Sequence, residues 1–442
     1  MKKLILLFLV SVASHAQYSP QIILDEEVFG ITEIITADLN NDGYKEVITS
    51  QKYFNNHKVS FFNNLGDGAF GSQQIVSTNL DTPLAVAAGD INTDGWIDLL
   101  SISRVENTAI YYLNQQGSFP DEVVFDNSFL NPLDIKTDDI DNDGDYDIVV
   151  LDRISLNIYY NQGSLNFTKQ TVDPGVITEY TDLIITDINN DGFKDIVTGS
   201  LLKTLIYINN NGQFFYDEAR TNSIGSEAFI TVTHMADFNN DGNIDLITNG
   251  GFFQDIRLYT NTGDGYFSFS QIIDLIVNCY SVSSIDYDQD GDLDVYTTIP
   301  QLGQVVWYEN IDGVMGEKNV IEEIDNVGAV KVHSDDLNND GKDDPMWSAP
   351  ISIYLSQDIL NNNEFDSVSK LSVYPNPSKG SFSIESTLNG TANIFNSMGQ
   401  KVYGNLPVAS GHNNYTVNLS PDIYFLQIIT NNKKSYIRLI IE

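Results

Sequence analysis

The stretch Asp139-Ile140-Asp141-Asn142-Asp143-Gly144-Asp145-Tyr146-Asp147 decides the fold of this chain. Carboxylates stand at its first, third, fifth and ninth positions, and a glycine stands at the sixth. A hard divalent cation such as calcium takes about six to eight oxygen ligands, which a short loop supplies when carboxylates alternate along it. Gly144 permits the sharp bend, because glycine reaches a positive φ at little cost. The stretch therefore predicts a calcium loop, in which position seven adds a backbone carbonyl.

Six further copies of this loop begin at Asp38, Asp90, Asp187, Asp237, Asp286 and Asp336. With Asp139 included, successive starts lie 52, 49, 48, 50, 49 and 50 residues apart. A constant period of this size is typical of repeat architectures. The predicted ligands use side-chain oxygens at positions one, three, five and nine and a carbonyl at position seven. They are Asp38, Asn40, Asp42, Tyr44 and Glu46; Asp90, Asn92, Asp94, Trp96 and Asp98; Asp139, Asp141, Asp143, Asp145 and Asp147; Asp187, Asn189, Asp191, Phe193 and Asp195; Asp237, Asn239, Asp241, Asn243 and Asp245; Asp286, Asp288, Asp290, Asp292 and Asp294; and Asp336, Asn338, Asp340, Lys342 and Asp344.

Two other interpretations explain these loops less well. An EF-hand needs a glutamate at position twelve and flanking helices, whereas that position holds Thr49, Val150 and Thr198 in three copies, and the flanks are rich in β-formers. Plain acidic turns are favoured by Asp, Asn and Gly, but seven of them would gather like charges unless a cation neutralised each. We therefore expect up to seven calcium ions with a structural role.

The copies are not identical. The loops at Asp139 and Asp286 carry four carboxylates, whereas the other five have asparagine at position three. Glu46 replaces aspartate at position nine of the first loop, and we expect its longer side chain to alter the coordination. Lys342 stands at position seven of the last loop, where only its carbonyl need face a metal. We expect that loop to be the least secure site.

Each repeat carries four β-rich runs with turn signals between them, the pattern of one antiparallel sheet. In the second repeat the runs Leu84 to Gly89 and Leu99 to Ser101 flank the loop, and a third run ends in the triplet Tyr112-Leu113-Asn114. Convincing helical periodicity is absent. Seven sheets fall within the range of roughly four to eight blades found in β-propellers, whose closure protects sheet edges. The prediction is an all-β fold, a seven-bladed β-propeller with calcium loops.

The chain also carries the means of closing such a ring. Gln21 to Glu26 is a run of the fourth kind that precedes the first loop, and the seventh repeat has no such run after Tyr354. We predict that Gln21 to Glu26 forms the outer strand of the last blade, paired beside Ile351 to Leu355.

Composition and the N-terminus indicate an exported, folded protein. The 442 residues carry a formal net charge of −39 and are 42% hydrophobic, too apolar for disorder; such acidity argues against nucleic-acid binding. Residues 1–16 read as a signal peptide, with Lys2 and Lys3, an apolar run and the cleavage site Ser14-His15-Ala16, so that Gln17 begins the mature chain. No later stretch predicts a transmembrane helix. Cys279, the single cysteine, permits no internal disulfide and is expected to be a buried apolar side chain.

The repeat resembles the FG-GAP/VCBS family, which also forms the propeller of integrin alpha subunits. The match is Asp-x-(Asp/Asn)-x-Asp-Gly-x-x-Asp followed by aromatic-x-Asn, and it covers about residues 20–357. The resemblance implies a seven-bladed propeller over residues 17–357, with calcium in the loop between the first two strands of each blade. In the second loop the ligand roles fall on Asp90, Asn92, Asp94, the Trp96 carbonyl and Asp98, and Glu46 departs from the pattern.

After a polar linker, residues 358–370, the acidic loops stop and short β runs remain over residues 371–442, which predicts a small β-sandwich domain. This tail is similar to the C-terminal sorting domain of the type IX secretion system. The matching stretches are Val373-Tyr374-Pro375-Asn376-Pro377, Met398 to Tyr403, Pro421 to Phe425 and Arg438 to Ile441. The resemblance implies recognition by that secretion machinery and a secreted or outer-surface protein of a Gram-negative bacterium.

Two functions remain open from the sequence. The first is a binding or adhesion module for a glycan or protein ligand, since a propeller offers a broad face of loops and function must be argued from the site. The second is a polysaccharide lyase or hydrolase on a calcium-stabilised propeller. His234 and His333, three residues before their loops, and Lys136 in the same place in the third repeat, are its candidate bases. We expect these three to be polar channel or seam residues, and we assign no catalytic residue.

Overall fold

The computed structural model describes residues 18–19, 21–25, 30–53, 56–66, 68–172, 180–200, 203–224, 230–250, 255–275, 279, 281–299, 302–323, 331–348, 351–356, 372–374, 378–386, 389–396, 401–430 and 433–441. The predicted signal peptide, residues 1–16, and the predicted linker, residues 358–370, lie outside the described residues. The chain divides into two compact units, Met1–Gln357 and Asp358–Glu442.

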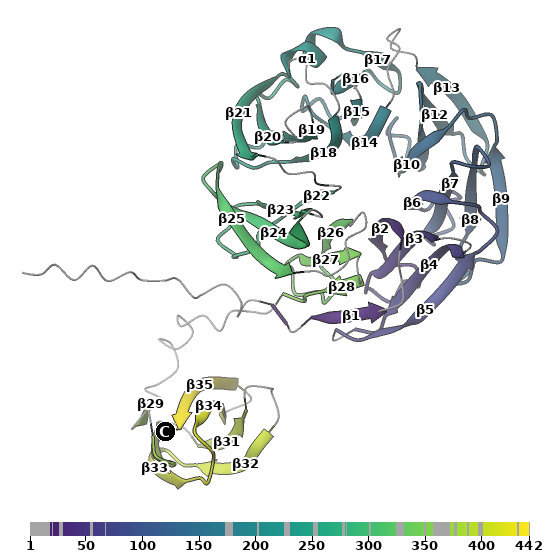
Figure 1. The fold of residues 1–442 in the computed structure, drawn as a ribbon. Coiled ribbons are helices and arrows are strands. Elements are labelled where there is room, and N and C mark those ends of the chain that lie inside the picture. Colours follow the sequence, from purple (N-terminus) through teal and green to yellow (C-terminus); the bar gives the residue numbers. More distant parts are fainter. Residues whose placement is uncertain are drawn as a thin grey trace, which may run out of the picture. The chain divides into compact units, whose positions relative to one another are not determined.

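The first unit is a ring of seven four-stranded antiparallel sheets, the blades of a β-propeller (Figure 1). In each blade the strand before the acidic loop lies innermost (Figure 1). This arrangement confirms the predicted seven-bladed fold. From the innermost strand outward, blade 1 is β2 (Ile31–Ala37), β3 (Glu46–Tyr53), β4 (Asn56–Asn64) and β5 (Phe70–Ser77); blade 2 is β6 (Pro83–Gly89), β7 (Asp98–Ser103), β8 (Thr108–Leu113) and β9 (Asp121–Asp126); blade 3 is β10 (Pro132–Asp138), β11 (Asp147–Asp152), β12 (Ser155–Asn161) and β13 (Phe167–Val172); blade 4 is β14 (Tyr180–Thr186), β15 (Asp195–Ser200), β16 (Leu205–Asn209) and β17 (Phe214–Tyr216); blade 5 is β18 (Ile230–Ala236), β19 (Asp245–Gly250), β20 (Asp255–Asn261) and β21 (Phe267–Asp274); blade 6 is β22 (Val282–Ile285), β23 (Asp294–Ile299), β24 (Gln304–Ile311) and β25 (Val314–Glu323); blade 7 is β26 (Val332–Asp335), β27 (Asp344–Ser348), β28 (Ile351–Ile353) and β1 (Ile22–Asp25).

The ring closes inside blade 7, as predicted. The N-terminal strand β1 pairs antiparallel with β28, in the register Ile22↔Ile353 and Ile23↔Ser352. One sheet thus contains strands from both ends of the propeller, and its main-chain hydrogen bonds hold the ring together.

The second strand of a blade is packed on both faces, which explains its run of apolar residues. Every residue of β7 and of β11 is buried. Leu100 and Ile102 of β7 belong to one apolar cluster with Ile148 and Val150 of β11. The propeller core therefore consists of seams between neighbouring blades.

Blade 4 departs from the pattern with a short helix, α1 (Glu218–Ser223), after its three-residue outer strand. Asp217 caps it, since its side chain accepts the N–H of Arg220 at 2.8 Å. Six residues are too few to produce the periodicity by which a helix is recognised in sequence, so no helix was predicted here.

The second unit is a small β-sandwich, as predicted. Its core joins Phe382 and Ile384 of one sheet to Ile394, Leu426 and Leu439 of the other. The sheets have the strand orders β29-β30-β33 and β32-β31-β34-β35, with β29 (Ser372–Tyr374), β30 (Ser381–Ser386), β31 (Gly390–Phe395), β32 (Lys401–Val408), β33 (Gly411–Thr416), β34 (Asp422–Thr430) and β35 (Lys433–Ile441).

Candidate metal centres

The first aspartate of each acidic loop bends the loop around its own carboxylate. In the third loop the Asp139 carboxylate accepts the backbone N–H of Asp143 at 3.1 Å and that of Gly144 at 3.1 Å, one on each oxygen. The same pair of bonds recurs in the other six loops, at Asp38, Asp90, Asp187, Asp237, Asp286 and Asp336. All seven predicted loops therefore share one geometry.

Position four of the loop adopts a left-handed backbone, a requirement that the sequence analysis missed. Asn142 has φ 61°, and Gly144 two residues later has φ 97°. Asparagine tolerates this region better than most residues, which explains its presence at position four of five of the seven loops. The positive-φ residues at position four are Asn41, Thr93, Asn142, Asn190, Asn240, Gln289 and Asn339.

The acid at position nine is fully buried and joins the two halves of the repeat motif. Asp147 is 0% exposed. Its Oδ2 accepts the N–H of Ile140 at 3.2 Å, and its Oδ1 accepts the N–H of Asn161 at 2.7 Å. Asn161 is the last residue of the aromatic-x-Asn triplet, so the triplet ends at the residue whose backbone N–H binds the loop acid. The equivalent acids, all 0% exposed, are Glu46, Asp98, Asp195, Asp245, Asp294 and Asp344.

These buried acids lie in an environment that opposes a negative charge. The pKa of Asp147 is raised to about 7 and that of Asp294 to about 8, because burial and the neighbouring loop carboxylates together outweigh the lowering effect of the backbone hydrogen bonds. The pKa of Asp245 is raised to about 6 by the same causes. A cation among these carboxylates would remove the penalty.

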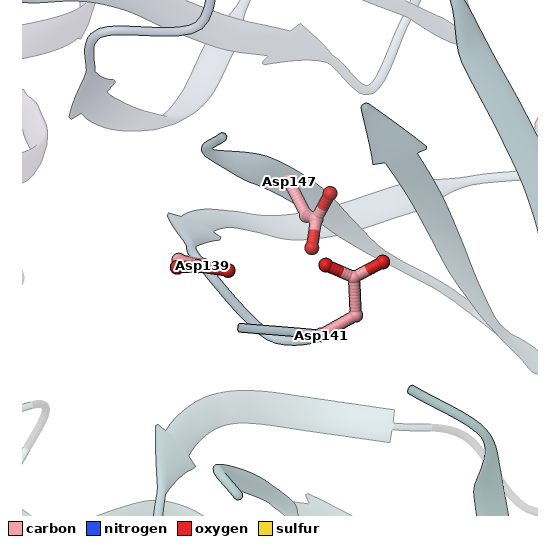
Figure 2. Close-up of side chains that lie close together, drawn as sticks. All are labelled: Asp139, Asp141 and Asp147. Carbon is pink, nitrogen blue, oxygen red and sulfur yellow. The ribbon is translucent and has the colours of Figure 1, made fainter. Parts of the chain in front are cut away.

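The two loops with four carboxylates bring three of them together. In the third loop, oxygens of Asp139, Asp141 and Asp147 lie within 4.8 Å of one another, and so do those of Asp286, Asp288 and Asp294 in the sixth. Figure 2 shows the carboxylates of Asp141 and Asp147 facing each other across the loop. Oδ1 of Asp141 is buried and accepts no hydrogen bond among the described residues. A bare oxygen among all-oxygen donors fits a hard divalent cation such as calcium.

The loops with asparagine at position three turn that side chain toward the loop backbone. In the first loop Oδ1 of Asn40 accepts the N–H of Asp42 at 2.8 Å. Glu46, despite its longer side chain, still reaches the N–H of Leu39 at 2.7 Å, and its other oxygen accepts a bond from Asn40 Nδ2 at 3.0 Å. Glu46 therefore occupies the place of the aspartate at position nine.

The lysine of the seventh loop reaches a side chain of the sixth loop. Nζ of Lys342 donates to the side chain of Gln289 in the sixth loop at 2.7 Å, while its backbone N–H donates to Asp340 at 3.0 Å, as position seven does in the other loops. The structure thus gives the ammonium group a partner outside the seventh loop.

The asparagine of the aromatic-x-Asn triplet also ties neighbouring blades together, a role that the sequence did not reveal. Nδ2 of Asn261 in blade 5 donates to the carbonyl of Ile188, at position two of the blade 4 loop, at 2.8 Å. The same nitrogen donates to the carbonyl of Ile244 in its own loop at 3.0 Å. Six asparagines bridge in this way: Asn64, Asn114, Asn161, Asn209, Asn261 and Asn310.

The three candidate bases are all engaged with partners. Lys136 of blade 3 lies 3.5 Å from Glu33 of blade 1 and 3.4 Å from Asp134, and a contact between blades that are not neighbours places it at the ring axis. His234 shares a hydrogen bond with Ser284 at 3.0 Å. His333 shares one with Thr36 at 3.1 Å. The predicted role as polar channel and seam residues agrees with these contacts.

Comparison with protein families gives matches to both units. Residues 38–101, 139–198, 187–248 and 237–297, together half of the chain, match the FG-GAP-like repeat family. Residues 372–442 match the secretion system C-terminal sorting domain. The seventh loop, at Asp336, lies outside the matched repeats, although its hydrogen bonds are those of the other six. None of the curated protein sequences matches the chain.

Solved structures with similar folds include β-propellers. One is BBS1N in complex with ARL6DN, with TM-score 0.55 and 12% identity, covering 79% of this chain and 99% of that chain. Another is the β-propeller domain of Cps50 (Swd1) from Myceliophteria thermophila, with TM-score 0.51 and 10% identity over 76% and 100%. A third is an Agrocybe aegerita lectin that recognises non-reducing terminal N-acetylglucosamine, with TM-score 0.50 and 18% identity over 67% and 81%. These similarities support the fold. In the described part of the chain, no helix has the length and apolar character that crossing a membrane requires.

Proposed function

The chain belongs to the FG-GAP-like repeat family and ends in a secretion system C-terminal sorting domain, and on that premise we propose that it is a calcium-stabilised propeller that acts as a binding or adhesion module outside the cell. The tail implies export by the type IX secretion machinery, and so a secreted or cell-surface protein. A Gram-negative source is part of the proposal.

The observation that carries the calcium assignment is the buried acid at position nine. Seven such acids, each 0% exposed, stand beside further carboxylates, and a protein of net charge −39 has little else to neutralise them. Extracellular calcium modules bind at about 0.1–1 mM. At about 1 mM calcium, a site with Kd of about 0.1 mM contributes roughly 1.4 kcal/mol of stability. Several such sites rival the net stability of a whole domain, about 5–15 kcal/mol.

Asp141→Asn tests the calcium assignment. It removes the bare carboxylate oxygen and gives the third loop the asparagine that five other loops carry. We expect the substitution to leave metal-free stability unchanged or slightly raised, because a like charge is lost, and to reduce the gain in Tm on adding calcium. Calorimetric titration and thermal unfolding with and without calcium measure both effects.

The matched control is Glu317→Gln, which neutralises one exposed acid on β25, outside the acidic loops. It should leave the calcium response unchanged. If the wild-type protein binds no calcium at millimolar concentration, the calcium assignment fails. If Asp141→Asn and Glu317→Gln respond alike, the charge of Asp141 has no part in binding calcium.

The candidate bases favour binding over catalysis. Burial lowers the pKa of His234 to about 4, well below the range near neutral pH that suits a general base. Burial also opposes the charge of Lys136, but Asp134 and Glu33 raise the pKa of this lysine above its usual value, so that it stays protonated. Neither group is ready to accept a proton at neutral pH.

A glycan array and a cell-adhesion assay, run beside a panel of polysaccharide-cleavage assays, test the function. Glycans with non-reducing terminal N-acetylglucosamine are a first set to try, because the structurally similar Agrocybe aegerita lectin recognises that sugar. We expect saturable binding and no cleavage. Cleavage that disappears in His234→Ala, while that variant keeps its fold and calcium response, would show an enzyme instead.

A further inference from the structure

One of the seven blades lacks the asparagine that bridges to the preceding loop. In blades 1 to 6 the triplet asparagine donates to the carbonyl at position two of the loop before it. Blade 7 has Ser356 at this place. Ser356 donates within its own blade, where its N–H bonds to Asp344 and its hydroxyl bonds to Asp340 at 2.8 Å. Position two of the sixth loop, Tyr287, therefore receives no asparagine from blade 7.

Tyr18, from the other end of the propeller, lies over this position instead. Its ring centre is 4.7 Å from that of Tyr287, and Tyr287 in turn lies 4.8 Å from Trp307 of β24. Tyr18 is only 8% exposed and belongs to one apolar cluster with Tyr287, Trp307 and Trp347 of β27. The seam between blades 6 and 7 is thus filled by aromatic rings from three parts of the chain.

The backbone around Tyr18 is fixed to the strand end that carries Ser356. Tyr18 forms an antiparallel bridge with Ser356. The N–H of Ser19 donates to the carbonyl of Leu355 at 2.8 Å, and the N–H of Leu355 donates to the Ser19 hydroxyl at 3.0 Å. In blades 1 to 6 a hairpin turn follows the asparagine, whereas in blade 7 the first and last residues of the propeller meet there.

The surroundings of the Tyr18 hydroxyl oppose its ionisation. Burial raises the pKa of Tyr18 above its usual range, and the charges of Tyr287, Asp344 and Asp286 raise it further. Asp286 begins the sixth loop and Asp344 ends the seventh. The hydroxyl has no hydrogen-bond partner among the described residues, so Tyr18 holds its place by packing.

We propose that Tyr18 takes the place of the missing seventh asparagine, and that Tyr18, Ser19 and strand β1 form the clasp that holds the sixth and seventh acidic loops together. The proposal concerns the protein fold and does not depend on which ligand the propeller binds. The predicted signal-peptide cut follows Ala16 and leaves Tyr18 as the second mature residue, so cleavage two residues further along the chain would remove this side chain.

Tyr18→Ala and Tyr18→Phe in the full chain test this proposal. The alanine variant empties the seam, and we expect amide hydrogen exchange in β22, β23, β26 and β27 to accelerate roughly tenfold or more, while exchange in blades 2 to 4 stays as in the wild type. The phenylalanine variant keeps the packing and loses only a hydroxyl without a partner among the described residues, so it should exchange as the wild type does. Equal acceleration in all blades, or the same loss in Phe as in Ala, would overturn the proposal.

A second substitution tests whether Tyr18 occupies the place of the missing asparagine or only adds apolar packing to the seam. Ser356→Asn restores the missing side chain. In the Tyr18→Ala background it should recover much of the lost protection, because the introduced amide can then donate toward the sixth loop. In the wild-type background it should give no gain or a loss of protection, because Tyr18 fills the space. The same effect in both backgrounds would show that the two side chains do not compete for one place.

Discussion

The outer hairpin of blade 5 and the corresponding region of blade 7 both contact the acidic loop of the preceding blade, but they do so through different residues. In blade 5 one continuous chain forms β20, a turn and β21, and Asn261 reaches back to the loop of blade 4 at 2.8 Å. In blade 7 the third strand, β28, and the outer strand, β1, come from opposite ends of the propeller sequence. No turn joins them, and Tyr18 packs over the preceding loop by ring contact.

The difference separates two ways of holding a blade to its neighbour. The asparagine makes two directional hydrogen bonds inside a buried seam, where an unmade bond costs about 1–3 kcal/mol. The tyrosine gains burial and ring packing, which depend less on direction. A repeat can therefore lose its standard residue at the point where the propeller begins and ends, provided that buried apolar area replaces the lost bonds.

The largest expected effect comes from removing calcium, which would destabilise the acidic loops beside both regions. Chelation leaves seven sets of carboxylates unneutralised, so Tm should fall substantially. The sixth loop has no asparagine from the next blade, and hydrogen exchange should therefore show it opening before the fourth loop, which Asn261 holds. Simultaneous opening of all seven loops would contradict this difference between the hairpins.

The metal-free protein should also show an unusual pH dependence. Burial raises the folded-state pKa of Asp98, Asp147 and Asp195 to about 7 from an ordinary value of 3.8. Between those values the folded state binds more protons than the unfolded state, so the free energy of unfolding falls as pH rises. Denaturant titrations from about pH 5 to 7.5 should thus show decreasing stability in chelator. In excess calcium the trend should reverse, because protons then compete with the metal.

Asn261→Ser is expected to have the next largest effect. It gives blade 5 the residue that blade 7 carries naturally, without a tyrosine to fill the seam. The buried carbonyl of Ile188 and the partly buried carbonyl of Ile244 lose the Asn261 donor, which should cost about 1–3 kcal/mol in the free energy of unfolding. The control is Asn210→Ser, an exposed asparagine in the blade 4 turn, which should change stability by less than about 0.5 kcal/mol. Equal costs would mean that the seam bonds contribute little.

The repeated parts of this molecule could be predicted from sequence, and the parts present once could not. Seven copies at a near-constant spacing allowed the number of blades, the loops and even the pairing of Ile22–Asp25 beside β28 to be predicted, because every copy supports the others. The cross-blade role of Asn261 stayed hidden, since a repeat shows that a residue recurs but not which neighbouring blade it contacts. The role of Tyr18 could not be predicted, because no other repeat has a residue in the same place.

The loop sites were predictable at the level of residue type. The template placed Asp139, Asp141 and Asp147 in one loop, and the structure brings their oxygens within 4.8 Å. It did not show that position nine is fully buried while position one bonds to the loop backbone. That distinction depends on the blade packed against the loop, which no local pattern contains.

The smallest expected effect tests whether close packing of a hairpin turn against the acidic loop of the preceding blade affects the metal site in that loop. Gly212, in the blade 4 turn, has φ 81°, and a Cβ there would lie 2.9 Å from Cβ of Asp141 in the blade 3 loop. Gly163 has φ 83°, but its Cβ would meet only Asp145 Oδ2 at an ordinary 3.7 Å. Gly→Ala at either position should cost about 1 kcal/mol in the free energy of unfolding from backbone strain alone. Only Gly212→Ala should also weaken calcium binding at the third loop, because it displaces a proposed ligand. Calorimetric titration of both variants measures the difference, and matching calcium affinities would show that the turn of one blade does not shape the metal site of the one before it.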